Sequence, residues 1–452
     1  MCGIFGVFNN KEAAELTYLG LYALQHRGQE SCGIVSTDKK KFYQSIGMGL
    51  ISDVFQKDVL SGLKGNSAIG HSRYSTAGST VLDNAQPISI KFIGNDLAIA
   101  HNGNLCNYRS LRLKLEKEGS IFQTTSDSEV ILHLIARSRR NTLEERIKDA
   151  LEKVKGAYSI LFLTQDKMIA VRDPLGIRPL CLGKVKNSFI VSSETCAFDL
   201  LGARYIRDIE PGEMAVFSGK GLVSRKIFRS PRKACCIFEY VYFSRPDSKV
   251  FGRPVYTIRR EFGRQLAREL AGRMNLKNAD IVIPVPDSAN VAAVGFSEQS
   301  GIPYEIGFIR NHYIGRTFIE PEQRIRDFGV KIKYNPVNEA LKGKEIILVD
   351  DSIVRGTTSR KLIRMLRKAG VKKIHHVISS PPIRYSCFYG IDTPVRDKLI
   401  ASHKNIEQIR KFIEVDSLYY LSLDGMVRST GMKKNDFCLA CFNGDYVIRP
   451  EK

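Results

Sequence analysis

The second residue of the chain is a cysteine, Cys2, with only Met1 before it in the sequence. If Met1 is removed, one residue carries both a thiol and a free α-amine, and such an amine titrates near ~7.7–8.0. The amine can take the thiol proton, so the sulfur can attack an electrophilic carbon without a histidine partner. Chance placement explains Cys2 alone equally well, so the rest of the chain must decide.

A second set of reactive residues lies in the sequence IILVDDSIVRGTTS, residues 346–359. Asp350 and Asp351 end an apolar stretch typical of a buried strand, and Gly356 allows a tight turn into a helix. Ligands bind at the carboxyl ends of strands in open α/β sheets, and helix N-termini attract phosphate. A capped helix after an acidic loop is the alternative interpretation. The residues expected to bind phosphate are Arg355, Gly356, Thr357, Thr358 and Ser359.

The elements that must hold these residues change in type along the chain. Up to about residue 230, short strands with few helices predict a layered α+β domain. Beyond a basic junction at residues 228–233, strands alternate with helices, which predicts a parallel sheet with crossovers. The predicted strands are 97–100, 159–163, 189–192, 280–285, 345–349 and 373–379, and the predicted helices are 12–25, 126–138 and 359–368.

Bulk properties restrict the class of protein. Its 452 residues suggest two or three domains. We find no apolar run long enough to span a membrane and no secretory signal, so we expect a cytoplasmic protein without a membrane partner. The formal net charge is +22. Because no nucleic-acid-binding motif accompanies this charge, we expect a basic surface and a phosphate-rich substrate, with no specific nucleic acid partner.

Longer motifs connect the chain to known domains. The strings QHRGQES (residues 25–31), GHSRYSTAGS (70–79), HNGNL (101–105) and RDPLGIRPL (172–180) resemble class II, Ntn-type glutamine amidotransferases. Residues 346–359 resemble the 5-phosphoribosyl-1-diphosphate (PRPP) motif of type I phosphoribosyltransferases. Together, these motifs resemble the amidophosphoribosyltransferase family from end to end, in its iron–sulfur branch without a long propeptide.

The resemblance implies a fold and an activity. An α+β N-terminal Ntn-type four-layer glutaminase domain (2–230) would precede an α/β type I phosphoribosyltransferase domain with a parallel sheet and a C-terminal extension (231–452). The family hydrolyses glutamine and channels ammonia to PRPP, which yields 5-phosphoribosylamine, pyrophosphate and glutamate in the first committed step of purine synthesis. The resemblance also implies purine nucleotides as feedback inhibitors and a homo-oligomer, commonly a tetramer.

Roles for the first-half residues follow from the same resemblance. Cys2 would be the nucleophile, while Asn102 and Gly103 would form the oxyanion hole. Arg73 would bind the glutamine α-carboxylate and Asp127 its α-ammonium group.

In the second half, Ser288, Asp350 and Asp351 match the family's Mg²⁺ positions. Residues 310–327 resemble a loop that closes over PRPP. Ala289 departs from the family, which usually has glycine there, so we expect a slightly reshaped diphosphate turn.

The C-terminal CxxC pair could alone indicate zinc, a redox pair or chance. Four thiolates suit either zinc or an iron–sulfur cluster, and the resemblance favours a [4Fe–4S] cluster. Its ligands would be Cys236, Cys387, Cys438 and Cys441.

Two alternative functions remain. One is another class II amidotransferase with the same first domain. The other is a PRPP- or purine-sensing regulator on the same fold, supported only by the charge.

Overall fold

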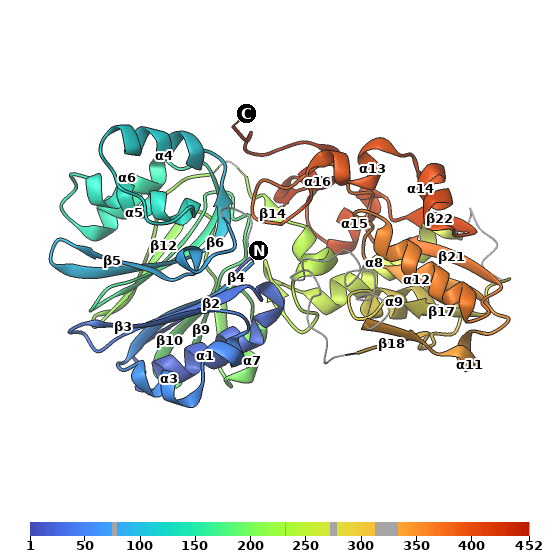
Figure 1. Cartoon of the computed structure of the whole chain (residues 1–452), viewed down its shortest axis with the longest axis horizontal. Helices are drawn as coiled ribbons and strands as arrows, with labels where there is room; N and C mark the ends of the chain where they lie inside the picture. The colour runs from blue at the N-terminus through green and yellow to red at the C-terminus, as the bar shows by residue number, and fades with distance from the viewer. Residues whose placement is uncertain (75–78, 231, 272–277, 312–332, 452) are drawn as a thin grey trace.

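The computed structural model describes residues 1–74, 79–230, 232–271, 278–311 and 333–451. Figure 1 shows two parts side by side, the first drawn in blue to green and the second mainly in yellow to red.

The first part contains two antiparallel sheets. In spatial order, the seven-stranded sheet consists of β11 (Arg204–Asp208), β9 (Cys181–Val185), β10 (Ser188–Ser192), β1 (Gly3–Phe8), β4 (Ser67–Arg73), β2 (Ser31–Thr37) and β3 (Phe42–Met48). The six-stranded sheet consists of β13 (Gly221–Lys226), β12 (Glu213–Ser218), β8 (Met168–Arg172), β7 (Gly156–Leu163), β6 (Asn95–Leu105) and β5 (Ile88–Phe92).

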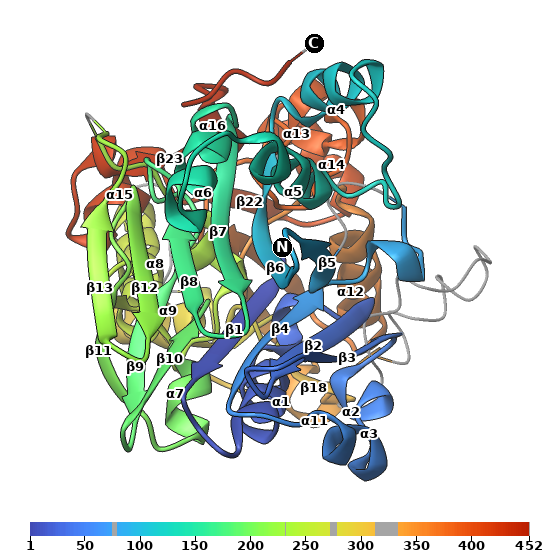
Figure 2. The same cartoon turned by 90° about the vertical axis from the view of Figure 1, so that its left-hand side faces the viewer.

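Side-chain alternation explains why these sheets stack between helices. In β1, Phe5 belongs to the apolar cluster that includes Leu21 of a covering helix, whereas its neighbour Ile4 belongs to the cluster that includes Leu161 between the sheets. Successive residues of a strand face opposite sides, so apolar residues throughout predict burial on both faces. The result is the expected four-layer α/β/β/α arrangement (Figure 2). The covering helices are α1 (Ala13–Ala23), α2 (Ile51–Val54), α3 (Lys57–Gly62), α7 (Cys196–Leu200), α4 (Tyr108–Lys117), α5 (Asp127–Arg137) and α6 (Leu143–Glu152).

The second part is built around a four-stranded parallel sheet, in agreement with the α/β prediction. Its strands, in spatial order, are β17 (Ile281–Pro284), β20 (Glu345–Asp350), β21 (Lys373–Ile378) and β22 (Ser417–Tyr420). The main helices are α8 (Val255–Leu270), α9 (Asn290–Ser300), α12 (Thr357–Lys368), α14 (Ile406–Ile413) and α15 (Leu423–Thr430). Helix α12 begins two residues before its predicted start, because Gly356, with φ of +74°, serves as its N-cap.

Smaller elements complete the second part. The two-residue strands β14 (Cys235–Cys236) and β23 (Phe437–Cys438) pair in parallel and tie its start to its C-terminal segment. Further short strands and α-helices are β15 (Lys249–Val250), β16 (Arg253–Pro254), β18 (Phe308–Arg310), β19 (Tyr334–Pro336), α11 (Asn338–Leu341), α13 (Ile400–His403) and α16 (Ala440–Asn443). None of the helices in the described ranges combines the length and apolar character that crossing a bilayer requires.

Candidate functional sites

Cys2 immediately precedes β1 and lies close to residues of β4 and β6. The pairing of Gly3 with Ser72 across β1 and β4 places Cys2 next to the end of β4 and therefore next to Arg73. The Cys2 thiol is 3.6 Å from the carbonyl oxygen of Tyr74, and the Cys2 backbone nitrogen donates to Asn102 Oδ1 at 3.2 Å. The fold thus brings the predicted nucleophile and the predicted oxyanion residue into direct contact.

The two polar atoms of the Asn102 side chain differ in their hydrogen bonding. Its Oδ1 is engaged by Cys2, while its Nδ2 is buried and has no hydrogen-bond partner among the described residues. A buried, unpaired donor is costly unless a ligand satisfies it. At Gly103, a Cβ atom would lie 2.0 Å from the Ala157 carbonyl oxygen, so only glycine permits this close approach. These two residues can accommodate an oxyanion beside Cys2.

The two predicted glutamine-binding residues line the same region but have protein partners here. Arg73 Nη2 donates to the Ser79 carbonyl oxygen at 3.2 Å. Asp127 Oδ2 accepts from the backbone nitrogen of Leu105 at 2.8 Å, which fixes the end of β6 just after Gly103. Contact with the substrate's charged groups stays a prediction for both side chains.

A buried ionic network beneath Cys2 went unrecognised in the sequence. Arg27 is fully buried; its Nε donates to the Cys2 carbonyl oxygen at 3.0 Å, and its guanidinium pairs with Glu194 and, at 3.0 Å, with Glu239. The two carboxylates hold the pKa of Arg27 above its usual range despite burial. Breaking a buried pair typically costs ~3–5 kcal/mol. In the sequence, the only indication of a role for Arg27 is its position inside the QHRGQES motif.

His71, in the same region, is held neutral by its surroundings. It is fully buried, and burial lowers its pKa to about 3. The unfolded chain binds a proton at His71 below about pH 6.5, whereas the folded protein does not. Stability is therefore lost as pH falls below about 6.5, at up to ~1.4 kcal/mol per pH unit.

We expect His71→Asn to flatten this part of the stability profile, measured by urea unfolding between pH 5 and pH 7. His403→Asn, at an exposed histidine, serves as the control and should keep the wild-type slope. An unchanged slope in His71→Asn would remove His71 as the cause.

The acidic pair lies where the sequence predicted, at the carboxyl end of β20. Asp350 and Asp351 are both buried, and Ser288 Oγ donates to Asp351 Oδ1 at 2.5 Å. Burial, together with the neighbouring Asp350 charge, raises the pKa of Asp351. A cation placed here would relieve this cost of keeping two adjacent carboxylates ionised.

The N-terminus of α12 faces the same edge of the sheet. No side chain caps this 12-residue helix, which leaves its first backbone N–H groups available to an anion. Ala289, which replaces the family's usual glycine, has φ of −91°, a value that alanine adopts readily. The predicted lid at residues 310–327 lies outside the described residues from 312 onward.

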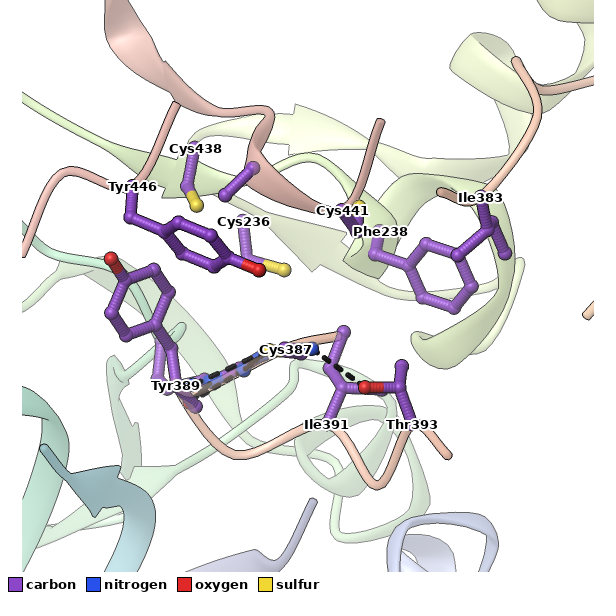
Figure 3. A pocket seen from close by; sticks show the side chains of 12 residues that line it. Cys236, Phe238, Ile383, Cys387, Tyr389, Ile391, Thr393, Cys438, Cys441 and Tyr446 are labelled. Carbon is purple, nitrogen blue, oxygen red and sulfur yellow. Dashed lines mark hydrogen bonds between the residues drawn. The ribbon is translucent and has the colours of Figure 1, made fainter. Parts of the chain in front are cut away.

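The four predicted cluster cysteines line one cavity together (Figure 3). Pairing of β14 with β23 places Cys236 opposite Cys438. Cys387 enters from a loop, and its sulfur accepts from the backbone nitrogen of Tyr389 at 3.3 Å. The cavity-lining residues are Arg178, Cys236, Phe238, Ile383, Cys387, Tyr389, Ile391, Thr393, Cys438, Ala440, Cys441 and Tyr446.

Known proteins resemble this chain over its whole length. A family model described as a glutamine amidotransferase domain matches residues 71–199. Amidophosphoribosyltransferase 1, chloroplastic, of Arabidopsis thaliana is 51% identical, with 99% of this chain and 79% of the relative covered. Amidophosphoribosyltransferase of Bacillus subtilis is 49% identical, with coverages of 98% and 94%.

Two solved structures also resemble this chain over almost their whole length. The allosteric regulatory enzyme of purine biosynthesis superimposes with a TM-score of 0.94 at 47% identity, covering 100% of this chain and 97% of the other. The glutamine PRPP amidotransferase of B. subtilis complexed with ADP and GMP gives a TM-score of 0.93 at 47% identity, with coverages of 100% and 98%.

Proposed function

The chain belongs to the amidophosphoribosyltransferase family, and from its two sites we infer which residues carry out each half of the reaction. It is a glycosyltransferase and glutamine amidotransferase of purine synthesis: it hydrolyses glutamine and passes ammonia to PRPP, forming 5-phosphoribosylamine, pyrophosphate and glutamate. The full-length match disfavours both alternative functions. The carrying observation is the contact between Cys2 and Asn102.

The test of the function is a paired assay on the purified protein. Glutamate and pyrophosphate should appear in equal amounts, and pyrophosphate should require both PRPP and a nitrogen donor. Glutamate release without any pyrophosphate would support glutamine hydrolysis alone and contradict transfer to PRPP.

We place the boundary between the two domains at residues 230 and 231.

For glutamine hydrolysis, we assign the covalent step to Cys2. The α-amine freed by removal of Met1 takes the thiol proton, and the sulfur adds to the carboxamide carbon. The oxygen then carries negative charge, which Asn102 Nδ2 and the Gly103 N–H stabilise. The carbon–nitrogen bond breaks, ammonia leaves with the transferred proton, and water hydrolyses the thioester to glutamate. Arg73 and Asp127 orient the two charged ends of the amino acid.

For transfer, we place PRPP at the carboxyl end of β20. Asp350, Asp351 and Ser288 would hold Mg²⁺, which supplies positive charge to the diphosphate leaving group. The uncapped N-terminus of α12, with Arg355 and Gly356 before it, binds the 5-phosphate. Ammonia displaces pyrophosphate at C1 of the ribose.

We expect Asp350→Asn to raise the KM for PRPP by ~10-fold or more, because even changes around metal ligands cost that much affinity. Glutaminase activity measured without PRPP should stay near wild type. Asp280→Asn is the matched control, since Asp280 precedes the neighbouring strand β17, at the amino end of the same parallel sheet, and accepts a hydrogen bond from the Glu345 backbone nitrogen. An unchanged PRPP dependence in Asp350→Asn would exclude Asp350 from the site.

We propose that the cysteine-lined cavity holds a [4Fe–4S] cluster. In the described residues, no three His, Cys, Asp or Glu side chains are grouped closely enough for one metal ion. A four-iron cluster gives each cysteine its own iron, so its ligands surround a volume rather than a point. Cys236, Cys387, Cys438 and Cys441 surround such a volume. Burial raises the pKa of the Cys236 thiol to about 11, so binding must release its proton.

We further propose feedback inhibition by purine nucleotides, supported by the ADP and GMP bound to the B. subtilis relative. A homotetramer remains our prediction for the oligomeric state. The cytoplasmic location also stays a prediction, because the Arabidopsis relatives are named as chloroplastic.

A further inference from the structure

The segment that follows Cys387 lies directly against the strand that carries the oxyanion hole. The Phe388 carbonyl oxygen accepts from Asn104 Nδ2 at 2.9 Å. Gly390 packs on the backbone of Gly103 so closely that a Cβ atom at Gly390 would lie 2.9 Å from the Gly103 carbonyl carbon. Two consecutive residues of β6 are therefore held by a loop from the other domain.

A buried arginine of the first domain also holds this loop. Arg178 Nε and Nη2 both donate to the Tyr389 carbonyl oxygen, at 2.8 and 2.6 Å. The Tyr389 backbone nitrogen in turn donates to Cys387 Sγ at 3.3 Å. Every residue from 387 to 390 thus has a fixed partner, and the chain of contacts runs from the cysteine-lined cavity to Gly103.

We propose that residues 387–390 are a positioning element of the glutaminase site, which sets the place of the Gly103 N–H relative to Cys2. This inference rests on the oxyanion role proposed for Gly103. An oxyanion donor acts over a narrow range of distances, and a misplacement of ~1 Å can cost ~10²-fold in rate. Ordering of the Cys387 loop, including by a group bound in the cavity, therefore supports glutamine hydrolysis.

Gly390→Ala tests this contact. Gly390 has φ of +105°, and its matched control, Gly221, has φ of +93° with nothing within 4 Å of the place a Cβ atom would take. Both variants carry the same kind of backbone strain, but only Gly390→Ala pushes on Gly103. We expect Gly390→Ala to lower kcat for glutamine hydrolysis by ~10-fold or more with little change in KM. Ammonia-dependent synthesis and iron content should match those of Gly221→Ala.

Asn104→Asp provides a second variant that keeps the side-chain size. It replaces the amide donor to Phe388 with a carboxylate, and we expect the same selective loss of kcat. A second measurement, the rate of iron release to a chelator, does not depend on catalytic turnover. Alkylation of Cys2 by a glutamine-analogue diazoketone should slow iron release to a chelator in the wild type, and this effect should vanish in Asn104→Asp.

The outcomes separate this inference from the proposed function. Glutamine hydrolysis that survives Cys2→Ala would refute the site itself, and an iron-free wild type would refute the cluster. Where hydrolysis requires Cys2, with or without bound iron, an unchanged kcat in Gly390→Ala and Asn104→Asp overturns the positioning role. An equal loss of the glutamine- and ammonia-dependent activities overturns it as well.

Discussion

Cys2→Ala is expected to lower glutamine-dependent synthesis of 5-phosphoribosylamine by ~10³-fold or more, as removal of a covalent nucleophile does elsewhere. Synthesis from added ammonia should continue, because the residues assigned to PRPP lie at the end of β20 and the start of α12 in the second domain. Pyrophosphate release, measured with glutamine and then with an ammonium salt at alkaline pH, gives both activities from one preparation.

Retention of Met1 should have the same selective effect, because the nitrogen of Cys2 is then an amide and cannot serve as a base. Met1 is buried in the structure, with its sulfur beside the guanidinium of Arg178, so cleavage also removes a buried side chain at the domain junction. Mass spectrometry of the active protein should therefore show a chain that begins at Cys2.

The control for the nucleophile is Cys32→Ala. Cys32 is a buried thiol of β2 in the same sheet, and burial raises its pKa to about 12, so it is not poised to react. Near-wild-type glutaminase activity in Cys32→Ala would assign the loss to the Cys2 sulfur. Loss of both activities in a folded Cys2→Ala protein would contradict the separation of the two sites.

Local patterns in the sequence were sufficient for most of the fold. An uninterrupted apolar stretch such as residues 346–349 is expected only where a strand is buried on both faces, and β20 is the second strand of the parallel sheet. Glycine next to hydroxyl residues marked the start of α12 to within two residues. The four-layer arrangement and the residue roles came instead from motif resemblance, since periodicity does not say which sheet stacks on which.

Contacts between the two domains could not be predicted in this way. Arg27 and Glu239 form a buried pair, and Gly390 packs on Gly103, although each pair is far apart in the sequence. Neither contact has a local pattern, because each depends on how the first domain sits against the second. Cys387 is likewise far from the glutaminase motifs in the sequence, whereas the residue after it contacts Asn104 of the HNGNL motif.

The second large effect is expected when the proposed iron–sulfur cluster is exposed to oxygen. Protein purified without oxygen should be brown and contain about four irons per chain, and it should bleach and lose activity in air. Iron and sulfide analysis with a visible spectrum checks this directly. A colourless, fully active protein with one zinc would exclude the iron–sulfur cluster and keep the four ligands. Active, metal-free protein would exclude the ligands as well.

Neighbouring cysteines provide a matched pair for this experiment. Cys236 lines the cavity, whereas Cys235 is buried beside it in β14 and does not. We expect Cys236→Ala to abolish iron binding and Cys235→Ala to retain it. Because the cluster would join β14, the Cys387 loop and the C-terminal segment, its loss should raise hydrogen exchange around Cys438 and Cys441. Exchange that stays at the wild-type level in iron-free Cys236→Ala would show that pairing of β14 with β23 holds this region without the metal.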